Sequence, residues 1–342
     1  MNRKVLIIGG NGHFGRLLTE DLRQHCNCEI VSGNRSSANL FDPSSIERAL
    51  SGVSVAICAA GPFQELPTTL AESCLRLGVH YIDFADDRNF VRKIHSLVEK
   101  WRTPQSAVCT AWSTVSALSG LLTSIAAGEL DQMDEIYIHL APGNRVPRGA
   151  ATIQSLLHSV GTSFTIWRGG QWQVIRGWSA GRDYMFPPPI GRHHGYLVDV
   201  PDHEFFPTLF RAKTVEFRTA SELQVLNMAV SSLAWFVSRG LVRNWVPWTG
   251  ALQAVAALFA AAGHDWGGVG VEVYGQKMHH RISVVADSGG QRIAVMPAAI
   301  MTELFLSGLE RHGLVSHAVW LTVDQLREAC TKRGFRLTLE EL

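Results

Sequence analysis

The segment Gly9-Gly10-Asn11-Gly12-His13-Phe14-Gly15 constrains the fold of this chain more than any other part of the sequence. It follows a short β-branched run, Lys4 to Ile8, and opens a helical pattern from His13 to His25. In this context the glycines permit a tight turn, close approach of the backbone to a pyrophosphate, and close packing of helix on strand. Amides at the start of the helix then receive the anion. We therefore predict a dinucleotide site formed by Gly9, Gly10, Asn11, Gly12, His13, Phe14 and Gly15; a purely structural turn is the alternative.

The residues after the second predicted strand, Glu29 to Ser32, distinguish the two nicotinamide cofactors. An NAD site needs a carboxylate about 20 residues past the glycines to accept from the ribose hydroxyls. This chain instead has Gly33-Asn34-Arg35-Ser36-Ser37 and no acid before Asp42. An arginine pairs with a 2′-phosphate through charge-assisted hydrogen bonds, and a serine can donate to it. We predict NADP(H) rather than NAD(H), bound by Asn34, Arg35 and Ser36; an exposed arginine in a turn is the alternative.

A third segment, Ala59-Ala60-Gly61-Pro62-Phe63, follows the predicted strand that ends at Cys58. Open α/β sheets bind ligands at the carboxyl ends of their strands, and small residues there let a cofactor pass close to the backbone. The predicted cofactor site therefore also includes Ala60, Gly61, Pro62 and Phe63.

Strands and helices alternate up to about Thr114, which predicts a doubly wound parallel sheet of the Rossmann type. Beyond it, runs with alternating apolar and polar residues predict a second α+β domain built on a mainly antiparallel sheet. The proline run Pro187 to Pro189 and the segment Gly191 to Gly195 have the proline and glycine content of loops. We predict a dinucleotide-binding domain over residues 1–118, a substrate and dimerisation domain over 119–300, and C-terminal helices over 301–342 that pack back on the first domain.

Composition narrows the class of partner. The formal charge of +1 provides no field to attract nucleic acid, so we expect a small-molecule substrate. The six cysteines have neither a disulfide nor a zinc spacing, and no signal-peptide pattern opens the chain, so we expect a cytoplasmic protein without a metal. The longest apolar region, Ala229 to Ala262, contains four aromatic residues that could form either a helix core or a lipid-facing surface: Trp235, Phe236, Trp245 and Trp248. We expect a helix core and therefore no peripheral membrane contact.

Several of these motifs together resemble the saccharopine dehydrogenase-like NAD(P)-binding family. They are Gly-Gly-x-Gly-x-x-Gly, Gly-Asn-Arg, Ala-Gly-Pro-Phe, and Cys74 followed by Gly78-Val79-His80-Tyr81-Ile82-Asp83. The resemblance covers about residues 1–125, and a looser one runs through Trp266 to Val271, Tyr274-Gly275 and Met296 to Ala299. It implies a hydride-transferring enzyme whose nicotinamide lies near Gly61 to Phe63, with substrate held between the domains. The chain departs from the pattern at Thr110 to Thr114, where relatives often have Gly-Asp-Pro-Gly, and this argues against saccharopine as the substrate.

Candidate catalytic groups follow from the expected position of the nicotinamide. We expect His80, Tyr81 and Asp83 at the end of the fourth strand, where a proton donor would stand, although Asp83 could instead cap a helix or fix a loop. Trp112, Arg145 and Arg148 are candidate substrate contacts, the arginines as a clamp for a carboxylate or phosphate, with a solvated loop as the alternative.

The sequence thus predicts an NADP(H)-dependent oxidoreductase that transfers hydride between a nicotinamide and an imine, carbonyl or enoyl substrate. The alternative is a non-catalytic NADP-binding sensor or scaffold. A homodimer formed through the second domain is a further expectation.

Overall fold

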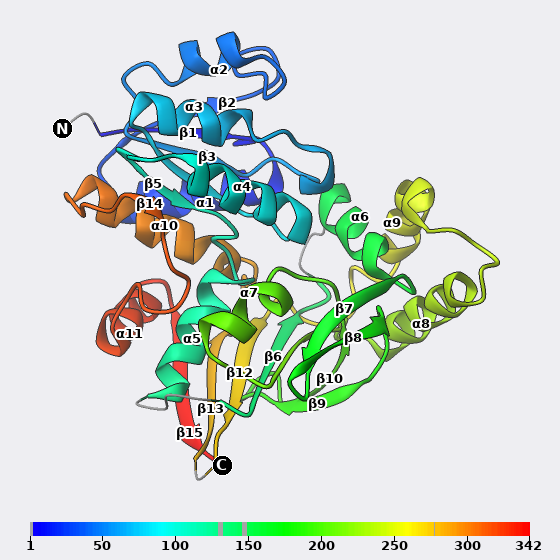
Figure 1. The fold of residues 1–342 in the computed structure, drawn as a ribbon. Coiled ribbons are helices and arrows are strands. Elements are labelled where there is room, and N and C mark those ends of the chain that lie inside the picture. The colour runs from blue at the N-terminus through cyan, green and yellow to red at the C-terminus, as the bar shows by residue number, and fades with distance from the viewer. Residues whose placement is uncertain (1–2, 129–132, 146–148, 277) are drawn as a thin grey trace. The chain divides into compact units, whose positions relative to one another are not determined.

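A computed structural model describes residues 3–128, 133–145, 149–276 and 278–342 (Figure 1). The chain divides into two compact units. The first unit contains Met1–Ala117 and Ala294–His317, and the second contains Leu118–Ile293 and Ala318–Leu342.

The first unit is built on a six-stranded sheet in the order β14-β5-β4-β3-β1-β2, in which every neighbouring pair is parallel. The strands are β1 (Lys4–Ile8), β2 (Glu29–Gly33), β3 (Val55–Cys58), β4 (His80–Asp83), β5 (Ala107–Cys109) and β14 (Gly313–Leu314). Residues Val5 to Ile8 of β1 are at most 3% exposed, as expected for a parallel strand covered on both faces. The predicted doubly wound sheet is therefore present.

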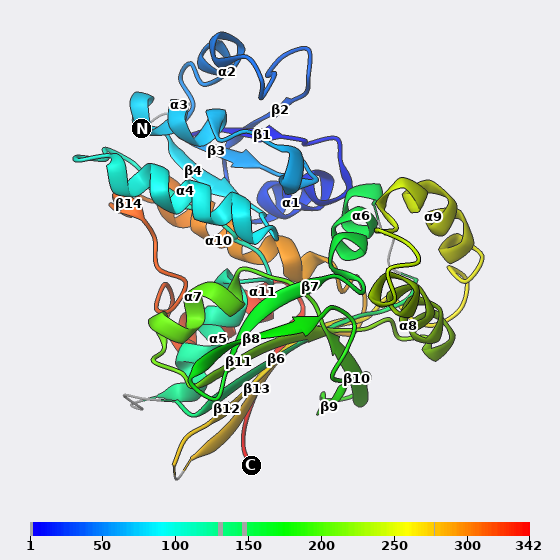
Figure 2. The same cartoon turned by 45° about the vertical axis from the view of Figure 1, so that its right-hand side comes forward.

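Helices lie on both faces of this sheet (Figures 1 and 2). They are α1 (His13–His25), α2 (Pro43–Ala49), α3 (Thr69–Leu77), α4 (Arg88–Lys100) and most of α10 (Arg292–Leu306), with the short η1 (Phe63–Glu65) after β3. The helix ends have identifiable causes. Asp87 caps α4 by accepting from the amide of Phe90 at 2.7 Å, and α3 ends at Gly78, whose φ of 69° suits glycine.

The strand order places β1 between β2 and β3, so the chain reverses its direction of progress across the sheet there. Ligands of open α/β sheets bind at the carboxyl ends of the strands at such a reversal. The glycine segment leaves β1 at this point, and the segments after β2 and β3 flank it.

The second unit contains a seven-stranded sheet in the order β15-β13-β12-β6-β11-β10-β9 and a separate β7–β8 hairpin. All pairs of the larger sheet are antiparallel except β6 with β11. The strands are β6 (Glu135–Pro142), β7 (Ser163–Arg168), β8 (Gln171–Arg176), β9 (Arg182–Met185), β10 (Arg192–Leu197), β11 (Thr214–Thr219), β12 (Gly267–Tyr274), β13 (His279–Ala286) and β15 (Phe335–Glu341). The predicted mainly antiparallel sheet is thus observed.

The helices of the second unit complete its layers. They are α5 (Ala117–Ala127), α6 (Ala150–Ser159), α7 (Asp202–Leu209), α8 (Gln224–Ser238), α9 (Thr249–Ala257) and α11 (Val323–Lys332), with η2 (Val246–Trp248) before α9. The Ser119 hydroxyl of α5 donates to Asp202 of α7 at 2.6 Å, and the imidazole of His203 accepts from the amide of Phe217 at 2.9 Å. These bonds fix α7 to α5 and to β11.

The seven-stranded sheet has one apolar and one polar face. On the polar face two buried glutamates each join two arginines: Glu216 binds Arg168 and Arg218, and Glu272 binds Arg182 and Arg281. A buried carboxylate is costly unless it is paired, so these contacts tie β7 to β11 and β9 to β12.

Two sequence-based predictions are wrong. Residues 318–342 belong to the second unit, not to helices packed on the first, because β15 pairs with β13 over seven residues from His280↔Glu341 to Ala286↔Phe335. The predicted loop at Gly191 to Gly195 is largely strand β10, which pairs with β9. Glycine and proline content indicates where the chain turns, but it does not indicate which strands pair with each other.

We expect opposite effects from two glycine substitutions in the second unit. A Cβ on Gly270 would lie 2.2 Å from the hydroxyl oxygen of Tyr184. A hydrogen bond of 2.8 Å between this hydroxyl and that of Ser283 holds the Tyr184 side chain in place. Gly270→Ala should therefore lower the free energy of unfolding by about 1–3 kcal/mol. Gly250→Ala, in α9 with no atom within 4 Å, should raise it by about 0.5 kcal/mol. Urea unfolding followed by circular dichroism measures both, and equal effects would contradict the packing described.

Candidate dinucleotide site and a second pocket

The glycine segment is held in a conformation that side chains would prevent. Gly9 has a φ of +79°, and its amide donates to the carbonyl of Gly33 at 3.1 Å. A Cβ on Gly9 would lie 2.7 Å from the amide nitrogen of Ala60, and one on Gly15 would lie 2.2 Å from the carbonyl oxygen of Gly9. These contacts bring the ends of β1, β2 and β3 and the start of α1 into one small region.

The start of α1 is open to an anion. Gly12 is its N-cap residue and supplies no side-chain hydrogen bond, and the first turn contains no acidic residue. Asn11 and Gly12 are exposed, and His13 and Phe14 are half-buried. Helix amides that lack a side-chain cap bind phosphate or carboxylate groups readily, so the local geometry suits a pyrophosphate.

Asn34 organises the turn after β2. Its side-chain oxygen accepts from the amide of Ser36 at 2.9 Å, the hydroxyl of Ser36 at 2.6 Å and the amide of Ser37 at 3.1 Å. The side chain of Arg35 is exposed and makes no hydrogen bond or ion pair with the residues that the structure describes. The turn therefore presents a guanidinium beside the glycine segment, while the Ser36 hydroxyl already has a partner.

The segment after β3 lies directly against the glycine segment. The amide of Ala59 donates to the carbonyl of Ile8 at 2.8 Å, and Gly61 is exposed. Phe63 differs from its neighbours, because its ring is 6% exposed and packs edge-on against Phe90 at 5.1 Å. Ala60, Gly61 and Pro62 can thus border a bound cofactor through exposed atoms, whereas the Phe63 side chain packs in the core.

Asp83 ends β4 and is fully buried. Its Oδ1 accepts from the amides of Ala85 at 2.9 Å and Ala111 at 2.8 Å, and its backbone carbonyl accepts from the amide of Trp112 at 2.7 Å. Ala111 has a φ of 55°, a conformation that costs energy for a residue with a Cβ. The observed contacts of Asp83 therefore hold the turn after β5.

Burial also changes the acidity of Asp83. Loss of solvent raises the pKa of its carboxyl to about 6, and the amides of Ala85 and Ala111 and the nearby hydroxyls of Thr110 and Tyr81 limit that rise. The carboxyl of Asp83 therefore titrates close to neutral pH.

The predicted position of His80 is wrong. β4 begins at His80 and ends at Asp83, so the Cα atoms of these two residues are roughly 10 Å apart at the usual rise per residue. His80 therefore lies at the end of the strand that is farther from the glycine segment. Its Nδ1 accepts from the amide of Ala107 at 3.1 Å, and its ring stacks on Phe305 at 4.1 Å between centroids. His80 packs β4 against α10.

Two further candidates are buried. Tyr81 is 1% exposed and Trp112 is 0% exposed. Burial lowers the pKa of His317 to about 4, so its neutral ring donates from Nε2 to the carbonyl of Thr110 at 2.8 Å and packs on Trp112 at 5.5 Å. Neither Tyr81 nor Trp112 presents exposed surface to a substrate.

The substrate arginines were predicted in the loop after β6. Arg145 is exposed, and its Nε donates to the carbonyl of Ala261 at 3.3 Å. Arg148 lies outside the described residues. The neighbouring Asn144 donates to the carbonyls of Phe259 at 2.6 Å and Ala262 at 3.0 Å. The observed contacts of Arg145 and Asn144 fix the loop to the segment after α9.

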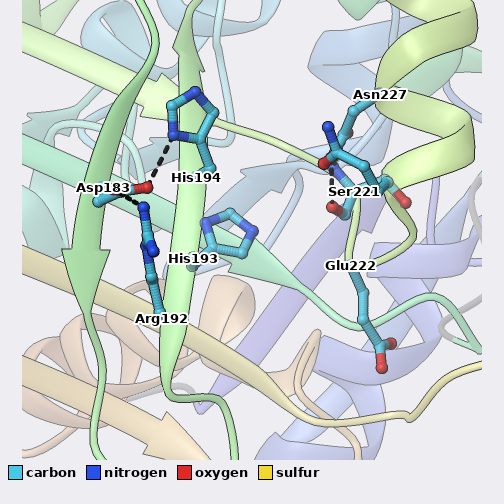
Figure 3. Close-up of a pocket in the computed structure, with 8 residues that line it drawn as sticks. Asp183, Arg192, His193, His194, Ser221, Glu222 and Asn227 are labelled. Carbon is cyan, nitrogen blue, oxygen red and sulfur yellow. Dashed lines mark hydrogen bonds and ion pairs between the residues drawn. The ribbon is translucent and has the colours of Figure 1, made fainter.

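The second unit has a pocket of about 250 Å³ that sequence reasoning missed (Figure 3). Asp183 of β9 binds Arg192 at 2.6 Å and His194 at 2.7 Å, both from β10. Adjacent residues on a strand point to opposite faces, and accordingly His193 is 6% exposed while His194 is exposed. The lining residues are Asp183, Arg192, His193, His194, Ser221, Glu222, Gln224 and Asn227.

Ionisation states around this pocket follow from its contacts. Burial lowers the pKa of His193 to about 4, so its ring is neutral. Partial burial alone would raise the pKa of Glu222, but hydrogen bonds from His264, at 2.6 Å from its ring and 2.9 Å from its amide, lower it. The pocket thus combines the neutral imidazole of His193, the Arg192–Asp183 ion pair and an ionised Glu222. Within the described ranges, no group of three or more His, Cys, Asp or Glu side chains is arranged to hold a metal ion.

No protein-family model and no curated protein matches the chain. Among solved structures it is similar to DAP dehydrogenase of C. glutamicum in complex with DAP, at 12% identity and a TM-score of 0.45 over 96% of this chain and 98% of that one. It is also similar to a dehydrogenase (MviM) from Clostridium difficile, at 9% identity and a TM-score of 0.40 over 97% of each chain. An oxidoreductase from Sinorhizobium meliloti has 9% identity and a TM-score of 0.44 over 99% of each chain. At these TM-scores the likenesses add nothing to the strand order and register described above.

We expect Asp83 to make stability depend on pH. Because its folded pKa, about 6, lies above the usual aspartate value of 3.8, ionisation is disfavoured in the folded state, and stability is lost as pH rises through this interval. Asp83→Asn keeps the Oδ1 acceptor but cannot ionise. Between about pH 3 and pH 7 the wild type should lose about 3 kcal/mol relative to the variant, most of it between about pH 4 and 6.

Urea unfolding of both proteins across this pH range measures the difference. Asp324→Asn is the matched control, because the side chain of Asp324 is 85% exposed. Parallel stability curves for wild type and Asp83→Asn would show that Asp83 does not titrate as described.

Proposed function

We propose that the chain is an NADP(H)-dependent oxidoreductase that transfers hydride between the nicotinamide and an imine, carbonyl or enoyl substrate. One observation supports it most strongly: the ends of β1, β2 and β3 meet around glycines that allow no side chain, beside an exposed Arg35 and an uncapped helix. The motifs shared with the saccharopine dehydrogenase-like family are consistent with this proposal.

The residues present fit the proposed cofactor. Amides at the start of α1 would hold the pyrophosphate, and Arg35 would pair with the 2′-phosphate. Ala60, Gly61 and Pro62 would border the nicotinamide half. When bound, the nicotinamide donates or accepts the hydride, and the chain's own contribution is to bind, orient and exclude water.

The polar pocket of the second unit is the proposed site for a polar group of the substrate. Asp183 holds Arg192 and His194 in place, so their remaining donors can face a carboxylate or carbonyl without first losing rotamer freedom. The Asp83 contacts would hold the turn after β5 in position during the reaction.

A specific observation favours the alternative of a non-catalytic NADP-binding protein. Of the three predicted proton donors, Tyr81 and Asp83 are fully buried, and His80 lies at the other end of β4. Oxidation of NADPH, followed by its absorbance across a panel of imines, ketones and enoyl thioesters, decides between the two. Turnover of any class supports the oxidoreductase, whereas tight NADPH binding with no turnover supports the sensor or scaffold.

Arg35→Ala should remove the preference for NADPH. Charged hydrogen bonds to a phosphate contribute about 1.5–3 kcal/mol, so the dissociation constant for NADPH should rise roughly 10- to 150-fold while that for NADH stays unchanged. Fluorescence titration with each nucleotide measures both constants.

Arg48→Ala is the matched control, since Arg48 is an exposed arginine in the last turn of α2 in the same unit. It should leave both constants unchanged. If Arg35→Ala retained the wild-type ratio of the two constants, Arg35 would have no part in selecting the cofactor.

A further inference from the structure

The helix α8 presents several large apolar residues to solvent. Val225, Met228 and Trp235 recur at helical spacing on one face and are 52%, 63% and 50% exposed. The opposite face carries Asn227 and Ala234, which are 3% and 8% exposed. α8 therefore carries large apolar residues on the side that faces solvent, where an amphipathic helix would carry polar ones.

The side of α8 that carries Asn227 and Ala234 packs on the protein. A Cβ on Gly161 would lie 2.5 Å from the carbonyl oxygen of Ala234, so the turn before β7 packs directly on the helix backbone. Trp178 donates to the carbonyl of Asn227 at 3.3 Å, and Arg176 donates to the carbonyl of Ser238 at 3.1 Å. These contacts fix which side of α8 faces outward.

Exposed apolar residues continue beyond α8 towards α9, and the two helices lie on the same side of the second unit in both views (Figures 1 and 2). Ring contacts link Trp235, Phe236, Trp245 and Trp248 at 5.2 to 6.5 Å between centroids. We use the name α8–α9 face for the exposed large apolar residues of this segment, which are Val225, Met228, Trp235, Phe236, Leu241, Trp248, Val255 and Leu258. The expectation that the four aromatics form a helix core is therefore wrong for Trp235, Phe236 and Trp248, which are 40–58% exposed.

The charges of this region have one sign. From Leu223 to His264 the sequence contains no Asp or Glu, and its two charged residues are Arg239 and Arg243. Both arginines are exposed, and the guanidinium of Arg239 lies over the ring of Trp235, 5.5 Å from its centroid. A cation beside an exposed indole suits a membrane interface, where the ring enters the headgroup layer and the charge meets lipid phosphates.

We propose that the α8–α9 face binds the surface of an anionic phospholipid bilayer. Large exposed apolar patches mark interaction sites, and the absence of acidic residues favours a surface of negative charge. No helix in the described part of the chain combines the length and apolarity that crossing a bilayer requires. The inference is independent of the proposed oxidoreductase activity.

Flotation of the full chain with vesicles tests the proposal. The protein should float with vesicles of phosphatidylcholine and phosphatidylglycerol, bind less to phosphatidylcholine alone, and dissociate as salt is raised. Trp235→Ser combined with Trp248→Ser should abolish flotation. Trp172→Ser is the matched control, because Trp172 is 49% exposed but lies on β8, and it should float as the wild type does.

The charge contribution is tested separately. Arg239→Gln and Arg243→Gln should each weaken binding to anionic vesicles about fivefold, the ratio expected for one basic residue near such a surface. Arg327→Gln, an exposed arginine of α11, should have no effect. Because all substituted side chains are exposed, circular dichroism should show unchanged folding.

Two results would overturn the proposal. One is absence of flotation with either kind of vesicle. The other is a wild-type dimer in light scattering that the tryptophan double variant converts to monomer, because a second copy of the chain would then cover the face.

Discussion

The contact between the backbones of Gly9 and Gly15 is the constraint on which the candidate cofactor site depends. No side chain fits at Gly15, because its Cβ would lie 2.2 Å from the carbonyl oxygen of Gly9. α1 can therefore start directly at the end of β1, with its first amides at the carboxyl edge of the sheet. A larger residue at either position would displace this helix start and with it the region where the ends of β2 and β3 converge.

Asp83, at the end of β4, stabilises the same edge of the sheet next to β3 and β5. The register pairs Asp83 with Cys58 of β3, and the Asp83 carboxyl binds the amide of Ala111 after β5. Burial raises the pKa of the Cys58 thiol to about 12, so Cys58 is a neutral neighbour. The Asp83 carboxylate thus joins the turns after β4 and β5, next to the end of β3, and these contacts leave it no exposed surface.

Local features of the sequence predicted the first unit well. The glycine segment, the buried run of β1 and the turn at Asn34 depend on neighbouring residues, and periodicity and glycine spacing report these directly. His80 was misplaced because it is the first residue of β4, and the two ends of a strand lie at opposite edges of the sheet. Tyr81 and Trp112 were chosen by chain position, which carries no information on burial.

The second unit required information that no local pattern contains. β15 pairs with β13 across a sequence separation of 49 to 61 residues, and the pocket depends on the pairing of Asp183 with His194 across the β9–β10 hairpin. In α8, the sequence did not indicate which side of the helix the protein would cover. The aromatic residues were assigned to a helix core because that is the simpler explanation, whereas the turn at Gly161 packs on the other side of α8.

The most direct test of the account is calorimetric titration of NADPH into the wild-type chain and into Gly12→Ala. A Cβ at Gly12 would lie 3.0 Å from the carbonyl oxygen of Gly9, so the fold can accommodate it with a small shift, but the methyl group would enter the space of the pyrophosphate. The account predicts one NADPH bound per chain by the wild type and binding at least about tenfold weaker by the variant, a loss of about 1.4 kcal/mol. A folded wild type that binds neither NADPH nor NADH would contradict it.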